Sequence, residues 1–351
     1  MSSSCCNESS QKPCCNKVPE IHELPPINNR GDFLCRVSDR FRMKYSICPG
    51  LYTIGTPDAT SPVLVTANYH LTTNVLRKAL GSLSAWILVL DTKGINVWCA
   101  AGKGTFGTSE LINRIKITKL DTIVKHRKII LPQLGAPGVA SHEVTKATGF
   151  QIQFGPVRAS DIPRYIQNGY TADESMRTVT FPIKDRLILT PMEFIPSLRK
   201  FVRVVLGMLV FFGIQRSGIM YKDALYHTLP LIIIGFIAII SGSVFFAALL
   251  PFIPFRSFAL KGTLLGSIVL VPLIWVNSNI YHGNLLLASA MTLFFIIMHS
   301  YVALNFTGCT TFTNVSGVKK EMRFAVPLYI AGLVVSLLLL IVFKLQTLGV
   351  L

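Results

Sequence analysis

The segment that decides the fold runs from Asn96 to Gly107 and reads NVWCAAGKGTFG. An apolar run from Ala85 to Leu90 precedes it and predicts a buried strand, and Asp91 to Gly94 predicts a turn. We expect a second short extended piece from Ile95 to Trp98, after which Cys99 enters a stretch of small residues. The pattern therefore places a thiol at a strand-to-helix junction, where α/β proteins bind their ligands.

Several interpretations of this segment follow from its residues alone. Cys99 can be a buried cysteine that acts as a small hydrophobic residue. The stretch from Gly102 to Gly107 fits the G-x-G-x-x-G pattern of dinucleotide-binding turns, and Asp121 lies about where a ribose-binding acid is expected. That pattern requires a glycine directly after the strand, which is absent here. A phosphate-binding P-loop is excluded because Gly104, rather than Ser or Thr, follows Lys103.

The same segment carries a resemblance to a known family. NVWCAAGK, from Asn96 to Lys103, resembles at every position the cap-helix motif of the HgcA family, the corrinoid proteins of microbial mercury methylation. Three flanking segments are similar to that family and to the related corrinoid iron–sulfur protein: VTANY at 65–69, LPQLGAPG at 131–138 and GPVRA at 155–159. The resemblance covers residues 45–191, and an apolar region follows it, as in that family.

The resemblance implies a corrinoid (cobalamin) site with Cys99 as the axial ligand of cobalt. None of the seven histidines lies in the Asp-x-His-x-x-Gly motif with which many cobalamin proteins supply a histidine ligand. Lys103, four residues after Cys99, can share a helix face with it. The other residues expected to bind the cofactor are Thr66, Ala67, Asn96, Val97, Trp98, Ala100, Ala101, Gly102, Gly135, Gly155 and Pro156.

The function implied by the resemblance is a corrinoid-dependent methyltransferase that transfers a methyl group from thiolate-ligated methylcob(III)amide to Hg(II). Hg(II) is an electrophile, so the methyl group must leave with its electron pair, and a strong sulfur donor opposite it favours that transfer. Two alternatives stay open. One is a membrane-tethered corrinoid methyl carrier in one-carbon or acetyl-CoA metabolism, and the other is a transporter with a regulatory soluble domain.

The implied chemistry requires partners. No cysteine cluster has the spacing of an iron–sulfur site, so a separate reductant is expected, which in the family is an HgcB-like ferredoxin carrying [4Fe-4S] clusters. A methyl donor such as a methyl-pterin, acting through a methyltransferase, would restore the methyl group. Nucleic acid is not an expected partner despite a net charge of +17, because the basic residues form no dense stripe interleaved with aromatics.

The region around the motif predicts a Rossmann-like α/β domain over residues 32–198. Apolar runs alternate with helical patterns, which indicates a parallel sheet with helices on both faces. Thr108 or Ser109 is the expected N-cap of the helix after the motif. The expected strands are 63–66, 86–90, 128–131, 149–154, 178–181 and 186–189. The expected helices are 75–80, 110–115, 141 onward and 161–167, with a loop at 132–138.

The last part of the chain, residues 199–351, predicts an all-α transmembrane domain of about five helices. The expected spans are 201–214, 229–250, 259–276, 285–304 and 324–343, of which the first is the shortest. With five spans, most flanking basic residues fall on the side that holds the α/β domain, which predicts a multi-pass inner-membrane protein with that domain in the cytoplasm. His299 is expected to hydrogen-bond between helices rather than to mark a transport path.

The first 31 residues are polar and proline-rich, which predicts a disordered tail, and no apolar core indicates a secretory signal. Eight cysteines in 351 residues do not make a disulfide scaffold. The tail contains two adjacent pairs, Cys5–Cys6 and Cys14–Cys15. Soft thiolate ligands suit Hg(II), and the spacing does not fit zinc. Capture of Hg(II) and an unselected tail are both open interpretations.

Overall fold

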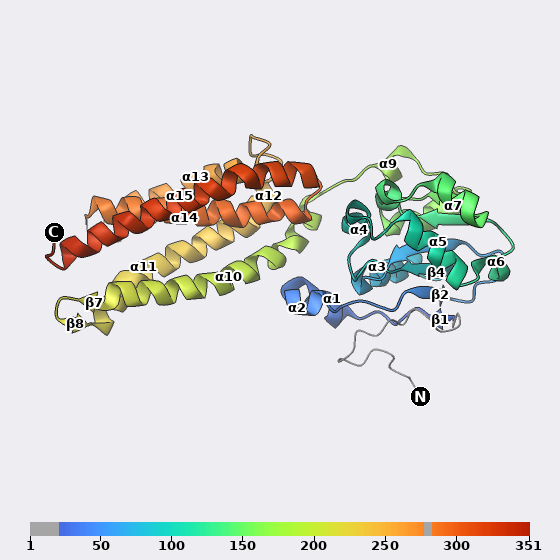
Figure 1. Cartoon of the computed structure of the whole chain (residues 1–351), viewed down its shortest axis with the longest axis horizontal. Coiled ribbons are helices and arrows are strands. Elements are labelled where there is room, and N and C mark those ends of the chain that lie inside the picture. The colour runs from blue at the N-terminus through green and yellow to red at the C-terminus, as the bar shows by residue number, and fades with distance from the viewer. Residues whose placement is uncertain (1–20, 277–282) are drawn as a thin grey trace, which may run out of the picture. The chain divides into compact units, whose positions relative to one another are not determined.

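The computed structural model describes residues 21–276 and 283–351, so Cys5, Cys6, Cys14 and Cys15 lie outside the described residues. The chain divides into two compact units, Met1–Val179 and Thr180–Leu351. The first holds a sheet with helices and the second is helical (Figure 1). Each is described by itself below.

The first unit is built on a six-stranded sheet with the strand order β1-β2-β4-β3-β5-β6. Its strands are β1 (His22–Glu23), β2 (Gly50–Ile54), β3 (Val63–Ala67), β4 (Ala85–Leu90), β5 (Lys128–Leu131) and β6 (Gln151–Phe154). The strands from β4 to β6 are mutually parallel, as expected, whereas β2 pairs antiparallel with β4. The sheet is therefore mixed.

Every residue of β3 and β4 is buried, because helices cover both faces of the sheet. On one face, Val65 and Leu88 join a core with α5 (Thr108–Ile117), α6 (Leu120–Ile123) and α7 (Ser141–Thr148). On the other face, Leu64 and Ile87 pack with α3 (His70–Leu80) and α8 (Ile162–Gln167). The sequence expectation of two helical layers is confirmed. The remaining helices of this unit are α1 (Asn29–Val37), α2 (Asp39–Arg42), α4 (Val97–Lys103), α9 (Glu174–Arg177) and the 3₁₀ segments η2 (Gln133–Gly138) and η3 (Ala159–Asp161).

Some sequence expectations about this region are wrong. Residues 95–98 do not form an extended piece, because helix α4 already begins at Val97. Gly107, rather than Thr108 or Ser109, is the N-cap of α5. Residues 178–181 form no strand, and 186–189 lie inside the 31-residue helix α10 (Ile183–Gly213). The expected loop at 132–138 is mostly the 3₁₀ segment η2.

The second unit contains long apolar helices. After α10 come the short strands β7 (Ile214–Gln215) and β8 (Gly218–Ile219), which pair with each other. The helices that follow are α11 (Tyr221–Ile240), the π-helical η4 (Ser241–Phe245), α12 (Phe246–Leu249), α13 (Phe258–Val276), α14 (Leu285–Asn305), the 3₁₀ segment η6 (Phe306–Cys309) and α15 (Val315–Thr347).

Four helical stretches of the described residues are long and apolar enough to cross a membrane, namely 221–249, 258–276, 285–308 and 316–347. They correspond to the last four expected spans. The first expected span, 201–214, is not among them, because Arg199, Lys200 and Arg203 interrupt the apolar residues at this end of α10. Five candidate spans are thereby reduced to four.

Close packing in this unit relies on small residues and on buried hydrogen bonds. The ring of Phe201 on α10 fills the space beside Gly235 on α11, where an added Cβ would lie 2.1 Å from it. His299 on α14 is fully buried, and its two ring nitrogens lie 2.8 Å from the Gly262 carbonyl and 3.1 Å from the Ser241 hydroxyl. The expected role of His299 in helix-to-helix hydrogen bonding is confirmed.

Candidate functional site

The strand order creates a topological switch point at the carboxyl edge of the sheet. The chain passes from β3 to β4 on one side of β3 and then crosses to β5 on its other side. Such a reversal is the switch point at which open α/β sheets bind ligands. Helix α4 follows β4, and η2 follows β5. These two segments pack against each other, and α4 also contacts β3, so α4 lies over this edge.

Helix α4 has defined ends despite its seven residues. Asn96 is its N-cap, and the side-chain oxygen of Asn96 accepts a hydrogen bond of 2.9 Å from the backbone N–H of Cys99. Gly104 ends the helix in the left-handed conformation at φ 78°, where its N–H reaches the carbonyls of Ala100 and Ala101. Glycine adopts this conformation without strain. The two caps hold Cys99 on a short, fixed turn.

The two faces of α4 differ in chemistry. Val97, Ala100 and Ala101 are buried in the core of the unit. The opposite face consists of Trp98, half-buried Cys99, Gly102 and Lys103, and Trp98 keeps 38% of its surface exposed. A Cβ added at Gly102 would meet nothing within 4 Å, so this face is open. The interpretation of Cys99 as a fully buried core residue is wrong.

The floor beneath α4 is tightly packed. Phe106, which is fully buried, fits against η2 so closely that a Cβ at Gly135 would lie 2.5 Å from its ring. A Cβ at Gly138 would lie 2.1 Å from the backbone oxygen of Phe106 and 3.1 Å from the Cα of Ala101. Only glycine allows these backbones to approach. Gly135 therefore acts as a packing residue beneath α4.

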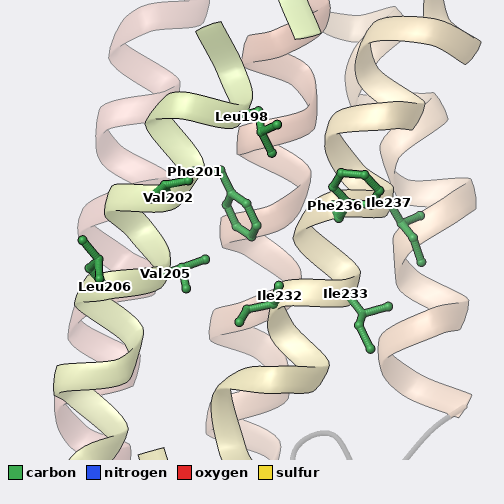
Figure 2. Close-up of a pocket in the computed structure, with 9 residues that line it drawn as sticks. All are labelled: Leu198, Phe201, Val202, Val205, Leu206, Ile232, Ile233, Phe236 and Ile237. Atoms are coloured by element: carbon green, nitrogen blue, oxygen red, sulfur yellow. The ribbon is translucent and has the colours of Figure 1, made fainter. Parts of the chain in front are cut away.

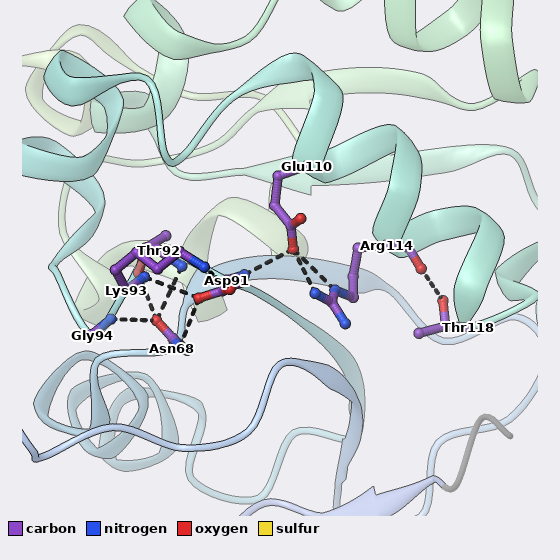
Figure 3. Close-up of polar contacts among 8 residues, drawn as sticks. All are labelled: Asn68, Asp91, Thr92, Lys93, Gly94, Glu110, Arg114 and Thr118. Atoms are coloured by element: carbon purple, nitrogen blue, oxygen red, sulfur yellow. Dashed lines mark hydrogen bonds and ion pairs between the residues drawn. The ribbon is translucent and has the colours of Figure 1, made fainter. Parts of the chain in front are cut away.

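A buried asparagine fixes the loop that leads into α4 (Figure 3). Asn68 directly follows β3, and its side-chain oxygen accepts hydrogen bonds from the backbone N–H groups of Thr92 (3.1 Å) and Gly94 (2.9 Å). The hydroxyl of Thr92 lies 2.8 Å from the same oxygen and 2.6 Å from the carbonyl of Ile95. One side chain thus ties the end of β3 to the start of the neighbouring loop.

Hydrogen bonds and an ion pair connect this loop to α5 (Figure 3). The side chain of Glu110 accepts hydrogen bonds from the backbone N–H of Asp91 (2.9 Å) and from Arg114 (2.7 Å). Arg114 is 3% exposed, so its charge is buried and paired. Burial raises the pKa of Asp91, but hydrogen bonds and the charge of Lys93 outweigh this effect and leave the pKa below its usual value. The loop before α4 is consequently anchored at both ends.

A second polar cluster lies around the start of α3. The Asp32 carboxylate accepts hydrogen bonds from Asn74 (2.6 Å) and Tyr45 (3.3 Å), and the ring of Tyr45 stacks on that of His70 at 4.4 Å. Burial, followed by the charge of Asp32, raises the pKa of Tyr45 to about 12. Burial lowers the pKa of His70, whose Nδ1 has no partner among the described residues, so His70 is neutral at pH 7.

The other expected site residues lie at the same edge of the sheet. Thr66 and Ala67 are the last two residues of β3 and are 3% and 0% exposed. Gly155 and Pro156 are buried directly after β6, and Gly155 donates a hydrogen bond of 2.8 Å to the carbonyl of Leu131. Alternation along β3 puts Ala67 on the α4 side and Thr66 on the α3 side. Their predicted contacts with a cofactor stay predictions.

The nucleotide interpretation gains no support from this geometry. Gly102 lies inside α4, Gly104 caps its end, and Gly107 begins α5, so the three glycines do not form one strand-to-helix turn. Asp121 lies exposed on α6. Among the described residues, no group of three or more His, Cys, Asp or Glu side chains could hold a metal ion.

Sequence reasoning missed the residues that hold the site in place: Asn68, Thr92, Phe106, Glu110 and Arg114. Asn68 lies within the flanking segment 65–69, whose resemblance assigns it no role. A polar residue directly after a buried strand is the available signal for Asn68, and the i, i+4 spacing is the signal for the Glu110–Arg114 pair. Nothing local marks Phe106, because its partners come from η2, about 30 residues later.

Comparison with known proteins places the similarity on this part of the chain. A model of the family described as CO dehydrogenase/acetyl-CoA synthase delta subunit matches residues 42–166. The gamma subunit of the acetyl-CoA decarbonylase/synthase complex from Methanopyrus kandleri is 35% identical over 146 residues, which are 41% of this chain and 30% of that protein. The same subunit from Methanothermobacter thermautotrophicus is 35% identical over 127 residues, 36% of this chain and 27% of that protein.

A further relative is the large subunit of the corrinoid/iron-sulfur protein from Moorella thermoacetica. It is 33% identical over 114 residues, which are 32% of this chain and 25% of that protein. The chain thus spans less than a third of the length of each of these three relatives. The family match begins before β2 and ends within α8, so it includes α4 and η2 but none of the long apolar helices.

Proposed function

We propose that the first unit binds a corrinoid and carries a methyl group, and that the apolar helices of the second unit attach it to a membrane. The observation that carries this proposal is the family match over residues 42–166, which includes the open face of α4 and its Cys99. One of the similar proteins is itself a corrinoid/iron-sulfur protein. This function is the alternative that the sequence left open, and it needs no assumption about the acceptor.

The residues on the outer face of α4 fit a flat macrocycle with a central metal. Gly102 leaves the outer face of α4 open, and Trp98 offers an exposed ring beside Cys99. Cys99 supplies a thiol, a donor that binds soft and transition metals. A bound corrinoid supplies a cobalt atom that accepts and releases the methyl group. Cys99 would hold that metal, and Asn96 fixes the turn on which Cys99 sits.

The supporting residues keep this arrangement rigid. Asn68 fixes the loop before α4 through three hydrogen bonds, and the Glu110–Arg114 pair holds that loop to α5. Phe106 and the glycines of η2 fill the space below, so water is excluded from the inner side of α4. Binding groups that sit on such fixed elements need little reorganisation when the ligand arrives.

A second candidate function is the transfer of the methyl group to Hg(II), as the likeness of NVWCAAGK to the HgcA family implies. The observation that favours it is the partial exposure of Cys99 on the outer face of α4, which makes a sulfur donor accessible. A thiolate pushes electron density toward the metal, and this suits transfer of the methyl group with its electron pair. An HgcB-like ferredoxin as reductant and a methyl-pterin-derived donor remain proposed partners, while transport stays a prediction without support.

The proposed location is the inner membrane, with the corrinoid domain in the cytoplasm. The four apolar helical stretches are each long enough for a hydrocarbon core of about 30 Å. Exposed Arg199 and Arg203 lie on α10, which precedes the first of these stretches in the chain, and basic residues that flank membrane spans are typical of the cytoplasmic side. Membrane lipid is therefore the proposed environment of the second unit.

The test uses the full chain, purified in detergent and loaded with methylcobalamin. We expect the absorption spectrum to report sulfur coordination, and Cys99→Ala to remove that spectral signature while Cys48→Ala, a half-buried cysteine outside α4, retains it. If the wild-type chain does not bind methylcobalamin, the corrinoid proposal is refuted. Product analysis with Hg(II) and with a thiol as competing methyl acceptors separates the two functions, because only the second candidate predicts methylmercury that depends on Cys99.

A further inference from the structure

A pocket in the helical unit has a mainly apolar lining that includes one lysine, Lys200. It lies among α10, α11, α14 and α15 and has a volume of about 190 Å³. Most of its lining is aliphatic or aromatic, including Phe201, Ile239 and Phe294. Four of the lining residues come from one face of α10, at positions 197, 200, 201 and 204, which is the spacing of a helix stripe.

One basic side chain lines this pocket. Lys200 lines it, and the ammonium group of Lys200 donates a hydrogen bond of 3.0 Å to the hydroxyl of Tyr301 and lies 4.9 Å from the centre of that ring. Among the described residues, Lys200 has no carboxylate partner within ion-pair distance. The side chain is exposed, so its charge is available to an anion.

A neighbouring groove provides the contrast (Figure 2). It runs between α10 and α11, is wider at about 530 Å³, and shares Phe201 with the first pocket. Its lining is wholly apolar, from Leu198 on α10 to Ile237 on α11. Such a surface can hold any hydrocarbon chain and selects no headgroup. The pocket at Lys200 differs because its lining includes a positive charge.

We propose that the pocket at Lys200 binds an anionic phospholipid, with part of one acyl chain inside that pocket and the phosphate beside the ammonium group. The charge complementarity supports a phosphodiester, since exposed Arg199 and Arg203 add two further cations within one turn of Lys200 on α10. The small volume admits one chain. The proposal goes beyond corrinoid binding and concerns only the helical unit.

The experiment is native mass spectrometry of the full chain released from detergent, titrated separately with phosphatidylglycerol, phosphatidylcholine and palmitate. We expect phosphatidylglycerol to bind most tightly. Lys200→Gln should weaken its binding about fivefold, the factor that corresponds to about 1 kcal/mol for one basic residue facing an anionic headgroup. Phosphatidylcholine binding should be unchanged by this variant, because its headgroup carries no net charge.

Two further variants make the result specific. Arg199→Gln removes a neighbouring cation that does not line the pocket, and we expect a loss of less than about twofold. Leu333→Trp adds bulk at a partly exposed lining position, and it should weaken phosphatidylglycerol binding while the unfolding temperature stays near that of the wild type. Equal losses in Lys200→Gln and Arg199→Gln, equal affinity for phosphatidylcholine, or palmitate binding as tightly as phosphatidylglycerol would each overturn the proposal.

Discussion

Replacement of Asn68 by alanine tests whether one side chain holds the loop before α4. Asn68 is 6% exposed, and its oxygen accepts hydrogen bonds from the N–H groups of Thr92 and Gly94. Asn68→Ala leaves both donors without an acceptor, and each buried unsatisfied donor costs about 1–3 kcal/mol. Thr92 is fully buried, so the cost of its unpaired N–H lies in the upper part of that range. Gly94 is half-buried, so its N–H can bond to water and costs less. We expect a total loss of about 2–4 kcal/mol in the unfolding free energy of the first unit.

The assay is urea unfolding of the full chain in detergent, followed by tryptophan fluorescence, because Trp86 and Trp98 both lie in the first unit. Asn113→Ala is the matched control, since Asn113 is exposed on α5 and should change stability by less than about 0.5 kcal/mol. Asn68→Asp keeps the accepting oxygens but places a charge about 3.5 Å from Asp91, so an intermediate loss is expected. A loss in Asn68→Ala no larger than in Asn113→Ala would refute the assigned role.

Three further predictions concern the same unit. Asn96→Ala removes the N-cap of α4 and should cost about 1 kcal/mol with faster amide hydrogen exchange in that helix, whereas Asn96→Asp should preserve protection. Gly138→Ala should destabilise by more than about 1 kcal/mol in urea unfolding, because its Cβ would collide with the backbone of Phe106, while Gly102→Ala should be tolerated. The pKa of Tyr45 is raised to about 12 in the folded state, so the contribution of this tyrosine to the unfolding free energy is complete below pH 10 and is lost as the pH rises from 10 to 12. Tyr45→Phe should therefore reduce the dependence of the unfolding free energy on pH between 10 and 12.

The strands at the centre of the sheet could be predicted because they are buried on both faces. Residues 85–90 are a continuous apolar run and residues 63–67 are apolar except for Thr66, which is the pattern of parallel strands covered by two helical layers. Strand β2 at 50–54 escaped prediction, since its antiparallel position beside β4 depends on pairing with a distant segment. The expected strand at 186–189 failed for a related reason, because its apolar residues belong to one face of a long helix.

The position of the candidate site in the sheet could be predicted, but helix α4 and the hydrogen bonds that hold the site could not. The motif locates Cys99 at the carboxyl edge of the sheet, yet residues 95–98, which are expected to be extended, contain the N-cap Asn96 and the start of helix α4. A helix of seven residues is too short to show a hydrophobic periodicity, so the only sequence signals for α4 are its capping residues, Asn96 and Gly104. The supporting network joins residues more than 20 positions apart, so no local pattern contains it.

The apolar side chains of the last helix, α15, are mostly not covered by the rest of the described chain. In the most apolar window of α15 only 6% of the residues are buried, and Phe324, Leu328 and Leu338 each expose more than half of their surface. An exposed apolar surface of this extent is rare on a monomer in water, because it favours aggregation. Whatever medium surrounds α15 is therefore a structural component in its own right, and detergent choice will decide whether the purified chain is observed as dispersed particles or as aggregates.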